Sequence, residues 1–496
     1  MSKQRIVILG GGPAGLAAGW KLAEQGHQVT VLEREGQLGG QSKTVRRGDW
    51  RFDLGGHRFF TKYDDVRREV EALVGGEKLV TNRKSVIRLQ GQYIQYPLEM
   101  TDLLSRMNPL VTMRAGLDYM VATARGKLLG RTDRSFEDWV VSRFGRTLYD
   151  LYFGIYTEKL WGMPPSQISA DWAAQRISLI NLWDVFVRLL GRGDDTPRTY
   201  LTEFIYPKWG IGMIPERMAD RTRAAGGRIL ADAEVLALER DGAGRITAVR
   251  FREGDGARSL PCDRVISTIP LPDLIQAMGL EAGAEQLRLV RNLRFRALRF
   301  LNLTLDFPAV SDNTWIYVPE RRFLFFRVQE PRNWSPHLSP PGKTSLILEL
   351  ACDRGDALWN ETDEVIYRRC LPQLVELGLL RPDQTDKVLD YFSTEMTHAY
   401  PIYDLDYKRK IDTALALCDR VPNLVTLGRQ GLFRYNNMDH SLKMAFTAVR
   451  HWDKPSLTER VRAVATEQAG FESDDDNQPD PMDDAARPSP LSVRGA

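Results

Sequence analysis

Six residues near the amino terminus carry the clearest chemical signal in the chain. Residues 10–15 match the pattern G-x-G-x-x-G, directly after an apolar run and before helical spacing. In such a motif Gly10 allows a tight turn, Gly12 lets the backbone approach a pyrophosphate, and Gly15 allows close helix packing. Glu33 lies where an acid would accept a hydrogen bond from a ribose. We therefore predict a dinucleotide site; the alternative is a glycine turn that binds no nucleotide.

Further glycine-containing segments lie downstream and at the far end of the chain. Gly39-Gly40 follows Glu33, and Gly55-Gly56-His57 comes next. Near the carboxyl terminus, residues 425–431 read as a strand running into glycines, with an amphipathic helix after them. Asn437 or Asp439 is expected to cap that helix, whose N–H groups would stabilise negative charge.

These segments resemble the FAD-binding parts of the amine oxidase and protoporphyrinogen oxidase superfamily. The string Phe52–His57 is especially similar to UDP-galactopyranose mutases. The resemblance implies an FAD cofactor and a binding domain built from both ends of the chain. It also implies that His57 lies beside the flavin; the alternative is that His57 is a core residue. It assigns the cofactor to Gly10, Gly12, Pro13, Ala14, Gly15, Glu33, Gly39, Gly40, Gly56, His57, Val235, Gly428, Arg429, Met438 and Asp439.

The resemblance to the mutases extends to a substrate pocket. Tyr156–Gly162 is similar to their uridine-contacting segment, and its tyrosine and tryptophan offer a hydroxyl and a stacking face. Arg327 falls where they carry a diphosphate clamp, and a guanidinium grips phosphate oxygens in pairs. The implied substrate-binding residues are Tyr156, Trp161, Arg176, Arg327, Tyr400 and Tyr435. The implied catalytic residues are His57, Arg327, Tyr400 and Tyr435. The alternative for each aromatic residue among Tyr156, Trp161, Tyr400 and Tyr435, taken singly, is an ordinary core residue. For Arg327 it is a solvated arginine.

Two segments depart from the mutases and keep a second function open. Ile177–Trp183 differs from their substrate lid, and Tyr206–Pro215 looks more like protoporphyrinogen oxidases and carotenoid desaturases. The first hypothesis is an isomerase of a nucleotide-linked sugar in which reduced flavin acts as a nucleophile. The second is an FAD-dependent oxidoreductase of an amine, porphyrinogen or polyene. The third is a flavin-binding protein without chemistry. Arg327, Tyr400 and Tyr435 favour the first.

The spacing of apolar residues indicates the elements that position these groups. Buried strands are predicted at Arg5–Leu9 and Val29–Leu32, with a helix over Pro13–Gln25 between them. Alternation from Gly226 to Phe251 predicts a β-meander. Further strands are expected at Arg264–Ile269, Arg299–Leu305, Trp315–Val318, Leu324–Val328 and Ser345–Leu350, with a helix at Val365–Leu377. The fold class is α/β, with a discontinuous Rossmann-like FAD-binding domain, a mixed-sheet substrate domain and a helical insertion.

The domain boundaries follow from this pattern. We expect the FAD-binding domain at residues 1–75, 205–270 and 415–460, and the substrate-binding β-sheet domain at 76–100 and 271–414. The helical insertion is expected at 101–204, and the acidic, proline-rich residues 470–496 are expected to be disordered. The apolar run Leu179–Leu190 either packs as an internal helix or makes peripheral contact with a membrane.

Composition narrows the class of protein. The 68 basic and 65 acidic side chains nearly balance, so nucleic acid is not an expected partner. The four cysteines form no CxxC pair, which argues against a zinc site and a disulfide framework. We find no export signal and no apolar run long enough to span a membrane, and we expect a cytoplasmic location. The expected partners are a small-molecule substrate and an external reductant such as NAD(P)H.

Overall fold

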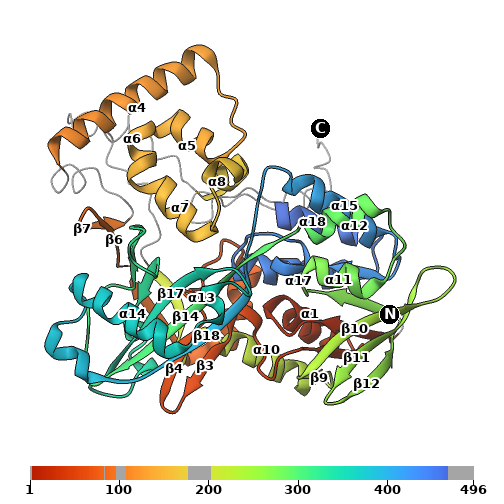
Figure 1. The fold of residues 1–496 in the computed structure, drawn as a ribbon. Helices are drawn as coiled ribbons and strands as arrows, with labels where there is room; N and C mark the ends of the chain where they lie inside the picture. The colour runs from red at the N-terminus through yellow and green to blue at the C-terminus, as the bar shows by residue number, and fades with distance from the viewer. Residues whose placement is uncertain (1–2, 83, 97–107, 177–202, 467–496) are drawn as a thin grey trace, which may run out of the picture.

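A parallel sheet joins early and late segments of the chain, and Figure 1 shows the early helix α1 (Pro13–Glu24) beside the late helix α17 (Met438–Arg450) on this sheet. The computed structural model describes residues 3–82, 84–96, 108–176 and 203–466. The strand order is β19-β13-β1-β2-β9. The bounds are β1 Arg5–Leu9, β2 Gln28–Leu32, β9 Arg228–Leu230, β13 Arg264–Ser267 and β19 Leu424–Thr426. We call this sheet with its covering helices the parallel-sheet unit.

The strands of this sheet are apolar throughout because both faces are covered. Ile6 and Ile8 pack in a cluster with α1, α10 (Met213–Ala224) and α17. Val7 and Leu9 pack in a second cluster on the opposite face. Successive side chains of a strand point to opposite faces, so a continuous apolar run serves both layers.

The predicted meander is divided between two sheets. β9 pairs in parallel with β2 and so belongs to the parallel sheet. The antiparallel part is a separate three-stranded sheet of β10 (Ala233–Arg240), β11 (Ile246–Glu253) and β12 (Gly256–Pro261). The prediction of one continuous meander from Gly226 is therefore wrong, because the alternation does not reveal which neighbour a strand pairs with.

A seven-stranded mixed sheet forms the second unit, the mixed-sheet unit. Its order is β18-β14-β17-β16-β15-β6-β7, and only β15 and β6 pair in parallel. Helix α14 (Asp363–Glu376) packs on this sheet through Ile366, Cys370 and Leu374. The strands are β6 Ser85–Leu89, β7 Gln92–Tyr96, β14 Phe295–Leu305, β15 Trp315–Tyr317, β16 Arg327–Gln329, β17 Thr344–Cys352 and β18 Val388–Pro401.

One predicted strand differs in this region, and one two-stranded sheet was not predicted. The strand expected at Leu324–Val328 begins only at Arg327, because residues 319–326 form the turn between β15 and β16. β5 (Lys78–Asn82) pairs with β8 (Glu203–Pro207) as a separate two-stranded sheet. Residues 78–82 therefore lie beside β8 and outside the mixed sheet.

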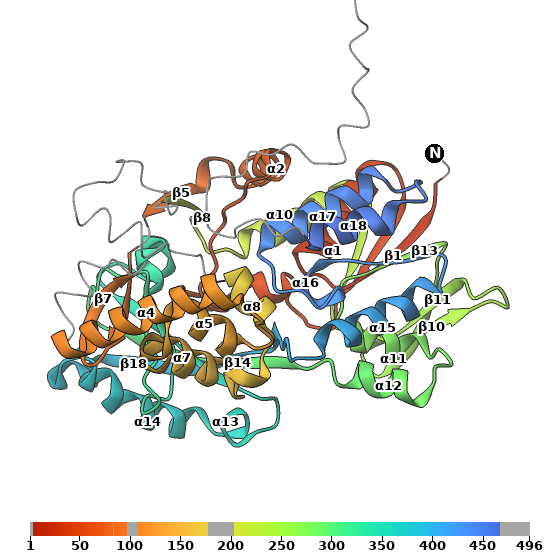
Figure 2. The ribbon, with the colours of Figure 1, turned by 90° about the horizontal axis from the view of Figure 1, so that it is seen from above.

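The third unit, which we call the helical unit, lies between β7 and β8 in the chain. It contains α4 (Pro109–Leu129), α5 (Phe136–Phe144), α6 (Arg146–Leu148), α7 (Gly154–Trp161) and α8 (Ala170–Arg176). The start of α5 is set by a capping box, in which Ser135 and Asp138 satisfy each other's backbone N–H groups. Figure 2 shows these helices gathered beside the mixed sheet. The run Leu179–Leu190 and the tail 470–496 lie outside the described residues.

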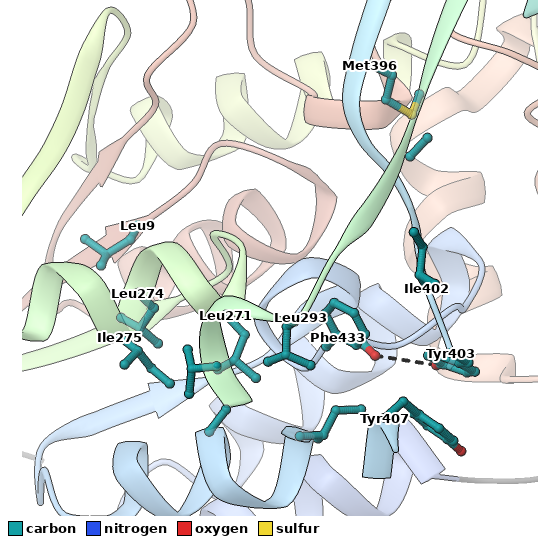
Figure 3. Close-up of a cluster of buried hydrophobic side chains, with 14 of the residues drawn as sticks. Leu9, Leu271, Leu274, Ile275, Leu293, Met396, Ile402, Tyr403, Tyr407 and Phe433 are labelled. Carbon is teal, nitrogen blue, oxygen red and sulfur yellow. Dashed lines mark hydrogen bonds between the residues drawn. The ribbon is translucent and has the colours of Figure 1, made fainter. Parts of the chain in front are cut away.

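One buried cluster joins all three units. Figure 3 shows Leu9 of β1, Leu271, Leu274 and Ile275 of α11 (Leu271–Met278), and Phe433 near Tyr403. The Tyr403 hydroxyl accepts a hydrogen bond from the Tyr435 backbone N–H at 2.9 Å. Residues of α5, α7 and β14 belong to the same cluster. Segments far apart in the chain are therefore held in contact at the place where the predicted site residues meet.

No helix in the described ranges is both long enough and apolar enough to cross a bilayer.

Candidate active site

A cavity of about 1190 Å³ lies where the three units meet. Pockets for one drug-sized ligand span roughly 300–1,000 Å³, so this cavity has room for a dinucleotide and a substrate together. One part is lined by backbone from the parallel-sheet unit, and we call it the backbone half. The other is lined by side chains of α7, β16, β18 and the segment after β19, and we call it the side-chain half.

The backbone half begins at the first turn of α1. Gly12 occupies the N-cap position of α1, and no side chain caps the helix. The N–H groups of the first turn therefore remain available for an anion such as a pyrophosphate. A Cβ on Gly15 would collide with the Gly10 carbonyl oxygen, so Gly15 allows the helix to pack against the strand end. These contacts are those that a phosphate-binding turn requires.

Glu33 lies just after β2 and is almost fully buried. Its carboxylate accepts hydrogen bonds from the backbone N–H of Gly11 at 2.7 Å and of Glu35 at 3.0 Å. Burial raises the pKa of Glu33, and these two backbone donors oppose the rise. A carboxylate has further lone pairs, so the held side chain can still accept a hydrogen bond from a ribose hydroxyl.

Two close approaches of glycines shape the floor of this half. A Cβ built on Gly40 would lie 3.3 Å from the Gly12 Cα. A Cβ on Gly428 would lie 3.0 Å from the Ala14 Cβ, so the segment after β19 packs directly on α1. Side chains here would fill the space that an extended dinucleotide needs. The cradle formed by backbone from residues 10–14, 40 and 428 therefore fits FAD.

Helix α17 closes the backbone half from the carboxyl-terminal side. Asn437 takes the N-cap position, but its side chain makes no capping hydrogen bond, and Asp439 instead pairs with His440 Nδ1 at 2.9 Å. The expected side-chain cap is therefore absent at this helix. Because no side chain caps α17, the N–H groups of its first turn could bind an anionic ligand atom.

His57 belongs to the second glycine segment and lines the cavity. Its Nε2 lies 2.9 Å from the Leu54 carbonyl oxygen. Burial, and next the nearby Arg429, lower the pKa of His57 to about 4. The imidazole is therefore neutral at neutral pH.

The Tyr206–Pro215 segment supports the glycine turn before His57 through hydrogen bonds to Asp53 and Thr44. The Tyr206 hydroxyl donates to Asp53 at 2.5 Å, and Thr44 donates to the other oxygen at 2.6 Å. Burial raises the pKa of Asp53 to about 6, although these hydrogen bonds favour the carboxylate. The backbone N–H of Gly212 donates to the Thr44 hydroxyl at 2.8 Å. The segment that departs from the mutases thus supports the glycine turn from outside the substrate pocket.

Aromatic rings form most of the side-chain half. Tyr400 and Tyr435 stack with ring centroids 5.3 Å apart and planes at 21°. Trp172 meets Tyr435 edge-on at 4.7 Å and Trp161 at 4.8 Å. Burial raises the pKa of Tyr400 above its ordinary value, so the phenol stays neutral and can donate a hydrogen bond. The predicted Tyr156, Trp161, Tyr400 and Tyr435 therefore contribute stacking faces and hydroxyls to the cavity wall.

Arg327 is held by a buried carboxylate. Its Nε and Nη2 each donate to Glu349 at 2.7 Å, and Gln329 donates to the same carboxylate. Glu349 has no exposed side-chain surface, and Arg327 is 15% exposed. Burial lowers the pKa of Arg327, but Glu349 more than offsets this, so the pKa lies well above its ordinary value. The guanidinium is a fixed cation whose remaining N–H groups can face a ligand.

Arg429 supplies a second guanidinium beside the tyrosines. Its centre lies 4.3 Å from the Tyr435 ring and 5.6 Å from the Tyr400 ring. It donates to the carbonyl oxygens of Asn436 at 2.7 Å and Ala399 at 2.6 Å. These acceptors are neutral, so they orient the guanidinium without cancelling its charge.

Two buried donors on the cavity wall have no hydrogen-bond partner among the described residues. They are the indole N–H of Trp161 and the side-chain amide nitrogen of Asn436. Both residues are at most 3% exposed. A buried unsatisfied donor costs about 1–3 kcal/mol, which a ligand acceptor would recover. These donors are suited to oxygen atoms of a bound molecule.

The cavity brings together most of the predicted site residues. Gly15 contributes by letting α1 pack on the strand end, and Gly39 contributes by forming a turn. Arg176 is the last residue of α8. The predicted residues that line the cavity are Gly10, Gly12, Pro13, Ala14, Glu33, Gly40, Gly56, His57, Tyr156, Trp161, Val235, Arg327, Tyr400, Gly428, Arg429, Tyr435, Met438 and Asp439.

Sequence reasoning missed Glu349, Trp315 and Tyr317. Glu349 carries a recognisable signal, because it is the single charged residue within the otherwise apolar or small run 345–351. A lone carboxylate in a buried strand needs a partner. Trp315 and Tyr317 carry no comparable signal, since aromatic residues are ordinary in strands.

Comparisons with known proteins agree with this architecture. A family model described as flavin containing amine oxidoreductase matches residues 13–412. A segment of 182 residues is 29% identical to a probable UDP-galactopyranose mutase of Klebsiella pneumoniae, covering 34% of this chain and 44% of that protein. A segment of 68 residues is 47% identical to an L-amino-acid oxidase of Crotalus adamanteus, covering 14% of this chain and 13% of that protein. The matches thus span less than half of these curated relatives.

Solved structures match over nearly the whole chain. Reduced UDP-galactopyranose mutase superposes with a TM-score of 0.79 at 21% identity, covering 94% of this chain and 99% of that one. A protein from Exiguobacterium sp. assigned as a protoporphyrinogen oxidase gives 0.70 at 18% identity, covering 91% and 99%. Putrescine oxidase bound to putrescine gives 0.59 at 15% identity, covering 91% and 99%. At these identities the likeness shows the fold.

The fold class predicted from the sequence is confirmed by these structures, and so is the use of FAD by the family match. The backbone cradle and the uncapped helices fit that cofactor. The protein is a flavoenzyme that uses FAD, and the chain belongs to the flavin-containing amine oxidoreductase family.

Proposed function

We propose that the protein is a UDP-galactopyranose mutase-like isomerase that acts on a nucleotide-linked sugar through reduced flavin. The observation that carries this proposal is the convergence of Arg327 and Arg429 on the stacked Tyr400–Tyr435 pair. Burial and Tyr435 raise the pKa of Tyr400 and Glu349 adds to the rise, whereas Arg327 and Arg429 each oppose it, so both guanidiniums lie within electrostatic reach of its hydroxyl. A diphosphate placed there would find charge and hydrogen-bond donors together.

The other residues of the side-chain half have matching roles in this proposal. Tyr156 and Trp161 would bind the nucleobase, with the unpartnered indole N–H meeting one of its oxygens. Arg327, held in place by Glu349, would keep the departing diphosphate close enough to recombine. Reduced FAD supplies a nucleophile for the sugar. His57 is neutral and would add no charge near a bound flavin. An external reductant such as NAD(P)H would keep the flavin reduced.

A second candidate is FAD-dependent oxidation of an amine, porphyrinogen or polyene. The aromatic lining favours it, because tyrosine and tryptophan faces bind cations as well as sugars and bases. The short match to an L-amino-acid oxidase points the same way. Against an amine, Arg429 lies 4.3 Å from the Tyr435 ring and would repel a second cation.

The deciding experiment uses the FAD-loaded protein with and without dithionite. We expect the reduced protein to interconvert the ring forms of a UDP-sugar, detected by chromatography, and the oxidised protein to be inactive. The matched arm adds amines, including L-amino acids and putrescine, to the oxidised protein without reductant. If one of these amines bleaches the flavin and no ring isomer forms from any UDP-sugar, the protein is an oxidase and the isomerase proposal is wrong.

A further inference from the structure

Helix α4 carries an exposed apolar stripe that the flavin site does not use. Of its 21 residues only Ala122 is buried. Eleven large apolar residues are exposed in the described part of the chain, and seven of them lie on α4, between 52% and 82% exposed. They are Leu110, Met113, Leu117, Met120, Val121, Leu128 and Leu129. Monomeric proteins rarely expose such a continuous stripe unless it contacts something.

The spacing of these residues places most of them on one side of the helix. Leu110, Met113, Leu117 and Val121 follow one another at intervals of three and four, which returns to the same face. The other side holds α4 to the molecule. Asp118 there accepts hydrogen bonds from the Thr147 N–H at 2.9 Å and hydroxyl at 2.6 Å. In Figure 1 α4 is the outermost helix above α5 and α6. The high exposure of the stripe shows that its side chains are not packed against them.

Basic side chains accompany the stripe. Arg114, Arg125 and Lys127 are exposed on α4, and Asp118, the one acidic residue of the helix, is engaged by Thr147. In the described ranges Arg125 and Lys127 form no ion pair with a carboxylate. The helix therefore presents an apolar stripe with three basic residues beside it and a single carboxylate, that of the part-exposed Asp118.

We propose that α4 docks the enzyme on a membrane surface that contains anionic lipids. A helix with an apolar face and neighbouring lysine and arginine lies in the interface plane, with its apolar side chains in the acyl boundary and its cations at the head groups. The helical unit that carries α4 also supplies Phe136, Tyr156 and Trp161 to the cavity wall. Docking would thus fix the substrate side of the enzyme to the lipid surface. The proposal does not depend on which reaction the flavin performs.

The test is co-sedimentation of the full-length, FAD-loaded protein with vesicles. We expect binding to phosphatidylcholine vesicles that contain phosphatidylglycerol, weaker binding to pure phosphatidylcholine, and loss of the difference at high salt. Met113→Gln, Leu117→Gln and Val121→Gln together should lower partitioning about tenfold or more, because three apolar side chains leave the acyl boundary. Arg125→Gln with Lys127→Gln should lower binding to the anionic vesicles on the order of tenfold.

A matched control replaces exposed apolar residues elsewhere. Val365→Gln, Leu389→Gln and Leu405→Gln together should leave vesicle binding unchanged. Flavin absorbance and melting temperature report that every variant is folded. The proposal is overturned if the wild type binds neither vesicle at low salt, or if the α4 variant binds as well as the control. A wild-type dimer that the α4 variant converts to monomer, without vesicle binding, would assign the stripe to a second copy instead. A lower melting temperature in the α4 variant, again without vesicle binding, would assign it to another segment of this chain.

Discussion

The two halves of the cavity are built by different means. The backbone half uses main-chain N–H groups and glycine contacts, and Glu33 there is held by the backbone N–H groups of Gly11 and Glu35. The side-chain half uses rings and guanidiniums whose orientation depends on partners from other strands, as Arg327 depends on Glu349. The first half is therefore sensitive to added volume, and the second is sensitive to lost partners.

The largest effect is expected from volume added to the backbone half. Gly15→Val should prevent accumulation of folded protein, because even a Cβ collides with the Gly10 carbonyl oxygen. Gly12→Ala is the matched control, since the nearest atom to its Cβ is Gly40 Cα at 4.0 Å. This variant should fold but bind FAD more weakly, as measured by flavin content and by the melting temperature of the apoprotein. A Gly12→Ala apoprotein that melts far below wild type would contradict the distinction between a glycine needed for folding and one needed for FAD binding.

Removing a partner should have the next largest effect. Glu349→Ala leaves the Arg327 guanidinium buried without its carboxylate, which should cost about 3–5 kcal/mol of unfolding free energy in chemical denaturation. The control is Glu395→Ala, an exposed carboxylate on β18. A loss below about 1 kcal/mol for Glu349→Ala, the range of an exposed pair, would show that the pair is not needed to hold Arg327.

The same pair gives a binding test. Uridine diphosphate at a hundredfold excess over its dissociation constant should stabilise the wild type by about 2.7 kcal/mol. Arg327→Lys keeps the charge but loses the paired planar donors, so this protection should shrink. Glu349→Gln should also shrink it, because the neutral amide has one acceptor oxygen and no longer holds the guanidinium through two hydrogen bonds. If uridine diphosphate neither stabilises the wild type nor perturbs its flavin spectrum, the diphosphate site does not exist.

The pH dependence tests whether His57 is as buried as its place in the glycine turn indicates. Its folded pKa of about 4 lies below the ordinary value of 6.5, so the unfolded chain binds a proton first as the pH falls. The wild type should therefore lose about 3 kcal/mol of stability between pH 6.5 and 4 on account of this residue. His57→Gln should remove that share, so the two denaturation curves converge at low pH. Parallel curves would place His57 in contact with water.

The smallest effect is expected at the ribose. Glu33→Ala removes one charged acceptor, so FAD affinity should fall by about 1.5–3 kcal/mol in titration of the apoprotein. Glu35→Ala is a control because the neighbouring carboxylate does not contact the Gly11 N–H. If the Glu33→Ala apoprotein takes up FAD as well as the wild type does, or takes up NAD instead, the assigned role of Glu33 is contradicted.

The sequence by itself determined the backbone half and the fold class. A glycine that must accept a close backbone approach, or an acid at the end of a strand, carries its meaning in local spacing, so Gly12, Gly15 and Glu33 are recognisable from the order of residues alone. The apolar periodicity likewise predicted most strands and helices, because buried faces repeat at fixed intervals.

Only the tertiary structure decided the side-chain half and the pairing of strands. That β9 joins β2 and that Arg327 is held by Glu349 are long-range contacts, and no local pattern encodes them. The missing cap at Asn437 has the same origin, since a residue type suited to a cap makes no bond until its neighbours orient it. Side-chain chemistry depends on partners from distant segments, whereas backbone chemistry depends on the residues next in the chain.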